Sequence, residues 1–200
     1  TSDSFPRARY ASIALTPDKS GLYYTKQTAA GPRVYYHKMG SDPAGDAEIF
    51  GQGYGIEKIV SCAISLEGRY ILYTVAYGSA ADRTELYFQN LSTKGPLVTL
   101  VKDIPARFSG GRIVGDQLFL QTNWKAPKGR VLLADLKSPA QENWREIIPE
   151  DDAVLQGFNL VGGKLVATYS KDASSRAKIF DPAGKLIREV SLPGIGSIGG

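Results

Sequence analysis

Cysteine, histidine and methionine are almost missing from this 200-residue chain, which has one of each. A single cysteine excludes an internal disulfide framework and a cysteine-ligated zinc site, and a single histidine argues against any other zinc site. Cys62 stands in the apolar run IVSCAIS, so we expect a buried, unreactive thiol there. One cysteine is compatible with the bacterial cytoplasm and with the periplasm.

Long apolar runs and clustered charges are also missing. No apolar run approaches about 18 residues, which argues against a membrane-spanning helix. The formal net charge is +4 and the pI is about 9.1, but lysine and arginine are scattered singly among acidic residues. They form no basic stripe of the kind that binds nucleic acid. We therefore expect neither a membrane nor a nucleic acid as a partner.

Motifs of known catalytic and cofactor sites are absent as well. Residues 194–199 read G-x-G-S-x-G, which is one residue out of register with the G-x-S-x-G elbow of α/β-hydrolases. The glycine-rich GQGYG lacks the lysine of a P-loop, and Asp151-Asp152, which we read as a solvated loop, lacks EF-hand spacing. His37 ends a strand-like run, where we expect a local hydrogen bond. The sequence thus predicts no catalytic residue, no cofactor and no metal.

The chain does contain strong β-strand signals, concentrated in residues 67–91 (EGRYILYTVAYGSAADRTELYFQNL). Aromatic and β-branched residues fill 69–75 and 85–90, and small polar residues separate these runs at 78–82, which predicts a β-hairpin. Residues 70–73 are apolar in succession, without the alternation of a half-exposed strand. A strand of this kind needs cover on both faces, so the hairpin should belong to a sheet between two other layers.

This unit recurs along the chain. The runs LYYTK, YILYT, LFLQT and LVATYS begin about 47 to 49 residues apart, at residues 22, 70, 118 and 165. The second strand of the hairpin recurs as VYYHK, LYFQN, VLLADL and AKIFD. A period of about 40 to 50 residues with several strands in each repeat is typical of β-propeller blades. The WD and kelch consensus residues are absent, so the repeat is degenerate.

We therefore predict an all-β fold of about four consecutive, four-stranded antiparallel blades. The predicted blades span residues 10–52, 58–102, 107–149 and 153–192. In phase with these, residues 194–200 (GIGSIGG) would begin a further blade. The only weak helix candidate is the segment PEDDAVL, residues 149–155.

A loop in the third repeat is the strongest candidate contact site. Residues 122–129 (TNWKAPKG) place Trp124 in a short polar segment between Asn123 and Lys125. An aromatic side chain beside a cation and an amide is typical of a contact surface. The alternative is that Trp124 covers the edge of its own blade, and the sequence leaves both interpretations open.

Several segments resemble the propeller domain of prolyl oligopeptidases. They are VYYHKMGSDPAGDAEIF, LEGRYILYTV, TNWKAPKGRVLLADL and ENWREIIPE, of which the WREIIPE part is the most specific. The similarity covers residues 10–200 and implies the middle blades of a seven-bladed propeller. It also implies a family of serine peptidases that cleave short peptides after proline. In that family an α/β-hydrolase domain carries the catalytic Ser, Asp and His, and the propeller restricts access to it.

The resemblance implies little about individual residues. In better-known members a basic residue follows the Thr-Asn pair of this loop and points toward the substrate, whereas here Thr122-Asn123 is followed by Trp124 and then Lys125. We expect Asn123, Trp124 and Lys125 to lie near the substrate, with Lys125 replacing the basic residue only if the loop shifts. The segment itself carries none of the catalytic motifs, so we expect it to be catalytically inert.

The expected partners follow from the same resemblance. They are the α/β-hydrolase domain of the parent protein and short proline-containing peptides. Four blades of a seven-blade ring would expose apolar blade faces, so we also expect a homo-oligomer, which sedimentation would detect. The alternative to a peptidase gate is a free-standing four-bladed propeller that binds peptides or proteins.

Overall fold

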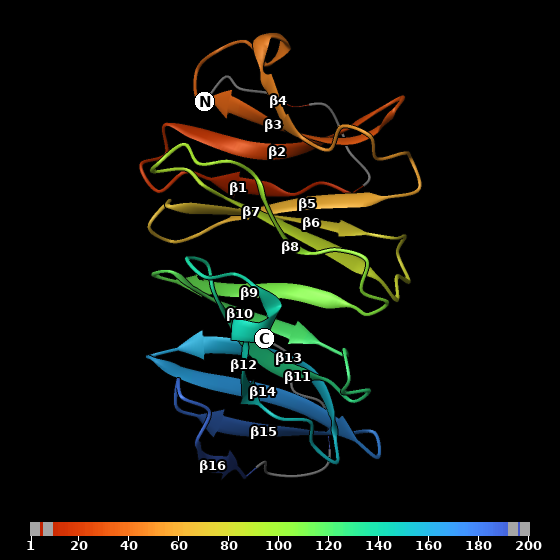
Figure 1. The fold of residues 1–200 in the computed structure, drawn as a ribbon, viewed down its shortest axis with the longest axis vertical. Helices are drawn as coiled ribbons and strands as arrows, with labels where there is room; N and C mark the ends of the chain where they lie inside the picture. The colour runs from red at the N-terminus through yellow and green to blue at the C-terminus, as the bar shows by residue number, and fades with distance from the viewer. Residues whose placement is uncertain (1–4, 6–9, 192–195, 197–200) are drawn as a thin grey trace. The chain divides into compact units, whose positions relative to one another are not determined.

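The computed structural model describes Phe5, residues 10–191 and Gly196 (Figure 1). The chain divides into two compact units, Thr1–Pro105 and Ala106–Gly200, which we call the N-terminal and the C-terminal unit. The predicted start of a further blade, residues 194–200, lies outside the described residues except for Gly196.

The N-terminal unit contains two antiparallel sheets of four strands. Their orders are β1-β2-β3-β4 and β5-β6-β7-β8, so each strand pairs with its neighbour in sequence. Such meanders form where aromatic and β-branched runs alternate with short turns rich in glycine, aspartate and serine. The strands are β1 Ile13–Leu15, β2 Gly21–Thr28, β3 Gly31–Lys38, β4 Ala47–Phe50, β5 Ile59–Ile64, β6 Tyr70–Ala76, β7 Thr84–Asn90 and β8 Val98–Val101.

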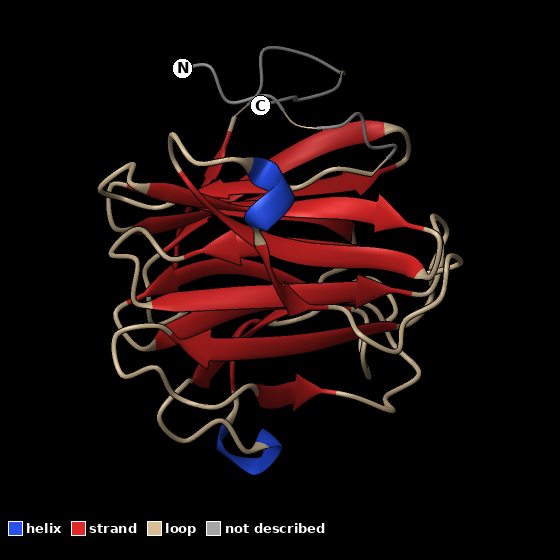
Figure 2. Cartoon of the chain, turned by 90° about the horizontal axis from the view of Figure 1, so that it is seen from above, coloured by secondary structure: helices blue, strands red, loops and turns tan. Residues whose placement is uncertain are grey.

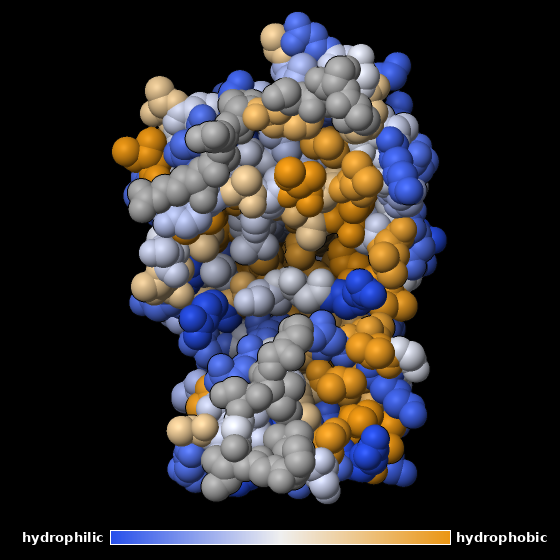
Figure 3. All heavy atoms as spheres, turned by 180° about the vertical axis from the view of Figure 1, so that it is seen from behind, coloured by the Kyte–Doolittle hydropathy of each residue, from blue (hydrophilic) through white to orange (hydrophobic). Residues whose placement is uncertain are grey.

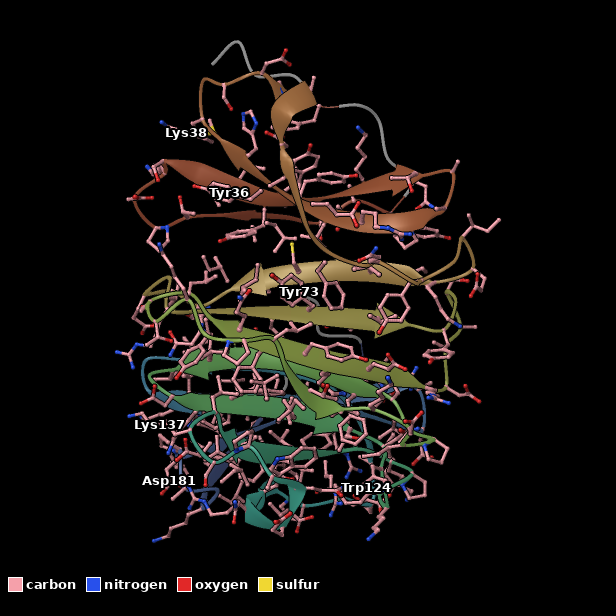
Figure 4. All side chains as sticks on the ribbon, turned by 45° about the horizontal axis from the view of Figure 1, so that its top comes forward. Tyr36, Lys38, Tyr73, Trp124, Lys137 and Asp181 are labelled. Atoms are coloured by element: carbon pink, nitrogen blue, oxygen red, sulfur yellow. The ribbon has the colours of Figure 1, made fainter. Side chains whose placement is uncertain are left out.

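The predicted hairpin is formed by β6 and β7, which pair Tyr73 with Tyr87. Residues 70–73 are all at most 3% exposed, as the uninterrupted apolar run predicts. Phe50 of the first sheet stacks on Tyr73 (labelled in Figure 4), with ring centroids 4.4 Å apart. The first sheet therefore supplies the cover for one face of β6.

The C-terminal unit repeats this arrangement with the sheets β9-β10-β11-β12 and β13-β14-β15-β16. Buried side chains from both sheets form a single core cluster, which includes Phe119, Leu133, Ile148, Leu165 and Tyr169. The strands are β9 Phe108–Val114, β10 Gln117–Thr122, β11 Arg130–Asp135, β12 Arg145–Ile148, β13 Val154–Val161, β14 Lys164–Lys171, β15 Ser174–Phe180 and β16 Leu186–Val190.

The described residues contain no α-helix, only two single turns of 3₁₀-helix, η1 Pro43–Gly45 and η2 Gln141–Asn143 (Figure 2). Each turn precedes the last strand of its sheet. At η1 the side chain of Asp42 accepts a hydrogen bond from the backbone amide of Ala44, which caps the turn. None of the helices in the described part of the chain has the length and apolar character needed to cross a membrane.

The helix candidate at residues 149–155 is wrong. These residues are irregular up to Val154, where β13 begins. The side chain of Asp151 accepts a hydrogen bond from the backbone amide of Ala153 and pairs with Lys178 Nζ at 2.6 Å. These contacts hold the segment as a turn beside β15, and a local hydrogen bond of this kind competes with helix formation.

One glycine shows how closely the two sheets of the C-terminal unit approach each other. Gly184, in the turn between β15 and β16, has a φ of 94°, in the left-handed region. A Cβ atom at this position would collide with the carbonyl oxygen of Ile147 in β12. Only glycine fits both the backbone conformation and the space.

Apolar side chains also reach the surface of each unit. Figure 3 shows them as patches beside strongly hydrophilic side chains. The most exposed large apolar residues among those described are Ile56, Ile13, Leu66 and Val161, at 70%, 66%, 65% and 61%. Association of the chain with copies of itself through apolar faces stays a prediction.

Candidate functional site

The predicted contact loop, residues 122–129, joins β10 to β11. Its backbone makes two successive turns, in which Ala126 N donates to Asn123 O at 3.2 Å and Gly129 N donates to Ala126 O at 2.8 Å. Lys125 lies within the first turn with a φ of 52°, in the left-handed region that few residues other than glycine adopt. The loop is therefore fixed by its own hydrogen bonds.

Trp124 packs against aromatic side chains of its own sheet. The centroid of its ring lies 6.2 Å from that of Phe108 and 6.4 Å from that of Trp144. Two cations face the same ring, with Lys125 Nζ 4.6 Å and Arg130 Cζ 5.4 Å from the centroid. These contacts are those of a tryptophan that covers its own sheet edge, and an approach of Trp124 to a substrate stays a prediction.

Asn123 closes the end of the ladder between β9 and β10. Its Oδ1 accepts a hydrogen bond from the backbone amide of Arg107 at 2.8 Å, and its own backbone amide donates to the Arg107 carbonyl at 3.3 Å. A hollow of about 60 Å³ lies beside the loop, between Asn123, Arg107 and Lys128. This volume is far below the roughly 300 Å³ of the smallest ligand sites.

A buried carboxylate with three phenol donors lies in the N-terminal unit and was not predicted. Glu85, in β7, is 2% exposed. Its Oε2 accepts hydrogen bonds from the hydroxyls of Tyr54 at 2.6 Å and Tyr87 at 2.7 Å. Its Oε1 accepts a hydrogen bond from the hydroxyl of Tyr77 at 2.5 Å, and Arg83 Nη2 lies 3.6 Å from the same oxygen. Because burying an ionised carboxylate is costly, these partners are what allow the charge to stay inside the unit.

The three tyrosines reach Glu85 from different parts of the chain. Tyr87 follows Glu85 by two positions in β7, so both side chains point to the same face of the sheet. Tyr77 comes directly after β6, and Tyr54 lies in the glycine-rich linker between β4 and β5. One feature of the sequence could have indicated this cluster. Glu85 is an acidic residue in a predicted strand, and charged residues are rarely buried without a partner.

Burial and hydrogen bonding set the pKa values in this cluster. Burial alone would raise the pKa of Glu85, but the hydrogen bonds from Tyr54, Tyr77 and Tyr87 outweigh it and hold the pKa below its ordinary value of 4.5. Burial raises the pKa of Tyr87 to about 12, and burial together with the Glu85 hydrogen bond raises the pKa of Tyr54. At neutral pH Glu85 is therefore ionised and its phenol partners keep their protons.

The cluster lines a hollow of about 660 Å³ that is built entirely from residues of the N-terminal unit. Its lining also includes residues of β4, of the linker 51–54 and of the segments that flank β8. Ligand sites in proteins have volumes of about 300 to 1,000 Å³, so this hollow has the size of a binding site.

Two other residues weighed from the sequence have structural roles. His37 is fully buried in β3, and its Nδ1 lies 2.9 Å from an oxygen of Asp46, which confirms the expected local hydrogen bond. Cys62 is 8% exposed, and burial raises the pKa of its thiol to about 11, which confirms a buried and unreactive cysteine.

The acidic pair at residues 151 and 152 is bound by cations of the chain itself. Asp151 pairs with Lys178, and Asp152 pairs with Lys171 and lies 3.7 Å from Arg176. Within the described ranges, no three His, Cys, Asp or Glu side chains gather closely enough to hold a metal ion.

Repeated antiparallel sheets of four strands in sequence order define the class of this protein, a β-propeller. The comparison with protein families is more specific. Residues 1–200 match the family described as prolyl oligopeptidase, N-terminal beta-propeller domain, and the chain belongs to this family.

Curated relatives agree with this assignment. The chain is 33% identical over 168 residues to the prolyl endopeptidase of Elizabethkingia miricola, a match that covers 84% of the chain and 23% of the relative. It is 30% identical over 168 residues to the prolyl endopeptidase of Elizabethkingia meningoseptica, with the same two coverages of 84% and 23%. The chain thus spans 23% of the length of each of these relatives.

Solved structures show the same fold. One from a study of inter-domain dynamics in two prolyl endopeptidases superposes with a TM-score of 0.87 at 28% identity, over 94% of this chain and 29% of that chain. Prolyl oligopeptidase B from Galerina marginata, bound to a 35mer hydrolysis and macrocyclization substrate, gives a TM-score of 0.83 at 22% identity. That second match covers 94% of this chain and 28% of the other.

Proposed function

We propose that this chain is the non-catalytic propeller segment of a serine endopeptidase of the prolyl oligopeptidase type, which cleaves short peptides after proline. In this proposal the propeller restricts access to an α/β-hydrolase domain of the parent protein, so that only short, unfolded peptides reach it. The observation that carries the proposal is the family match over the whole chain. The likeness in fold to a prolyl endopeptidase, with a TM-score of 0.87, supports it.

The test compares the full-length protein with the 200-residue chain. The substrates are a fluorogenic peptide with proline before the scissile bond and the same peptide with alanine in that place. We expect the full-length protein to cleave the proline peptide in strong preference and the chain alone to cleave neither. Equal cleavage of both peptides by the full-length protein, or turnover by the chain that survives removal of contaminants, would refute the proposal.

The loop at Asn123, Trp124 and Lys125 is the part of the chain that we propose to lie near the substrate. Replacing Lys125 with alanine in the full-length protein is expected to raise KM for the proline peptide roughly three- to tenfold, with a smaller change in kcat. Lys125 is the variant of choice because its side chain is exposed, whereas truncating Trp124 would also disturb the contacts with Phe108 and Trp144.

Lys137 provides a matched control. It lies at the opposite end of the strands from Trp124 (Figure 4), and its side chain is 70% exposed. Replacing Lys137 with alanine removes the same charge from the same unit and should leave KM unchanged. If the two variants have the same KM, the Lys125 side chain takes no part in substrate binding.

A further inference from the structure

We propose that the hollow in the N-terminal unit binds an extended peptide segment that presents a carboxylate next to an aliphatic side chain. This site is separate from the loop at residues 122–129, which belongs to the other unit, and it does not depend on the proposed peptidase activity. The argument rests on the charges, the apolar side chains and the strand that line the hollow.

The acidic groups that line the hollow already have partners. Glu85 accepts hydrogen bonds from three phenols. Asp103 accepts a hydrogen bond from Arg83 Nη2 at 2.7 Å, and Glu48 lies 3.6 Å from Arg33 Nε. Arg33 and Arg83 therefore offset the charges of Glu48 and Asp103, whereas Glu85 keeps its negative charge among its phenol donors.

The two lysines that line the hollow can still donate hydrogen bonds to a ligand. Lys58 Nζ lies 3.6 Å from the centroid of the Tyr77 ring and 3.4 Å from an oxygen of Glu57, a residue whose side chain is 64% exposed. Lys102 also lines the hollow, and its charge helps to lower the pKa of Glu85. Each ammonium has three donors, so both lysines can bind a further acceptor. Lys58 and Lys102 are therefore the lining groups that a carboxylate of the ligand would contact.

The apolar part of the lining indicates what accompanies the carboxylate. Ile49 and Leu97 both line the hollow, and they are 40% and 47% exposed. One comes from β4 and the other from the segment before β8, so the apolar lining is drawn from both sheets of the unit. Covering this surface gains about 25 cal/mol for each Å² removed from water.

The strand β4 favours a peptide over a small anion. It is the last strand of its sheet and pairs only with β3 in the described chain, and Glu48, Ile49 and Phe50 of this strand line the hollow. The edge of a sheet presents backbone donors and acceptors that an extended peptide can pair with. A peptide can therefore use the strand edge, the apolar walls and the lysines together.

The test measures fluorescence anisotropy of a labelled, C-terminally amidated peptide, Gly-Leu-Asp-Leu-Gly, with the full-length protein. This peptide has no proline, so the proposed peptidase activity would not consume it. We expect at least fivefold tighter binding than that of the peptide with Asn in place of Asp. A third peptide has Asn and a free C-terminal carboxylate, and it tests whether the site takes a side-chain carboxylate or a terminal one. Tight binding of the Asp peptide or of this third peptide supports the site.

Variants locate the binding. Lys102→Ala is expected to weaken binding of the acidic peptide five- to tenfold and to bring it to the level of the Asn peptide, and Leu97→Ser should weaken both peptides. Lys38→Ala, which changes an exposed lysine of the same unit outside the hollow, should leave the affinity unchanged. The proposal is overturned if the Asp and Asn peptides bind equally, or if neither binds. It is also overturned if Lys102→Ala has no effect, or if acetate at the same concentration as the peptide displaces it.

Discussion

Alanine in place of Glu85 is expected to accelerate the chemical labelling of Cys62 by roughly a hundredfold or more. The substitution leaves the hydroxyls of Tyr54, Tyr77 and Tyr87 without their common acceptor. Removing one member of a buried, charged network costs about 3 to 5 kcal/mol. A loss of 3 kcal/mol in the free energy of unfolding raises the population of opened molecules by a factor of about 150.

Cys62 is a suitable probe because it is the only cysteine and lies, 8% exposed, in the core cluster of the same unit. Its thiol reacts with a disulfide reagent only when the unit opens, so the labelling rate follows the local free energy of unfolding. Glu67→Ala, an exposed glutamate of the same unit, is the matched control and should leave the rate unchanged. Equal rates for the Glu85 and Glu67 variants would mean that the cluster adds nothing to the stability of the unit.

The contribution of Glu85 should also depend on pH, in a direction that its pKa sets. The pKa is lowered in the folded protein, so the stabilisation is complete above the ordinary value of 4.5 and is lost as the pH falls through the folded pKa. The labelling rates of the native protein and of Glu85→Gln should therefore differ most near pH 7 and converge in acid. A thiol becomes less reactive as the pH falls, so each labelling rate is divided by the rate of a small-molecule thiol measured at the same pH.

The strands were largely predictable because their signals are local. The run at residues 85–90 was expected to be a strand and lies in β7, Thr84–Asn90, since Asp82 and the small residues before it end the preceding loop. The start of β15 was less predictable, because Asp172 and Ala173 adopt positive φ values of 49° and 57°. They form a two-residue hairpin turn that pairs Lys171 with Ser174, and the usual signature of such a turn is Asn-Gly or Asp-Gly.

The carboxylate cluster was not predictable for a different reason. Tyr54 and Glu85 are 31 positions apart, and their contact depends on how the linker lies against the second sheet. Periodicity predicts that Glu85 and Tyr87 share a face, but it cannot tell which distant hydroxyls converge on that face. For Trp124 the sequence left open a contact site and cover of its own sheet edge, and the ring contacts with Phe108 and Trp144 match the second interpretation.

Alanine in place of Leu165 is expected to have a similarly large effect on the C-terminal unit. Leu165 is fully buried in β14, within the core cluster that both sheets of the unit share. Truncation of a buried leucine costs about 2 to 5 kcal/mol, because transfer free energy is lost and a cavity remains. With a urea dependence of about 1 to 3 kcal/mol per molar, the unfolding midpoint should fall by about 1 to 2 M.

Tryptophan fluorescence reports this transition selectively, since both tryptophans of the chain, Trp124 and Trp144, belong to the C-terminal unit. Leu165→Met, which keeps most of the volume, should cost less than about 1.5 kcal/mol. Val161→Ala removes apolar atoms from a side chain that is 61% exposed and should change the free energy by no more than about 0.5 kcal/mol. Trp124 and Trp144 lie in the connections of the sheet β9-β10-β11-β12, whereas Leu165 lies in the sheet β13-β14-β15-β16. An unchanged midpoint for Leu165→Ala would therefore show that the two sheets do not unfold together, which would contradict a shared core.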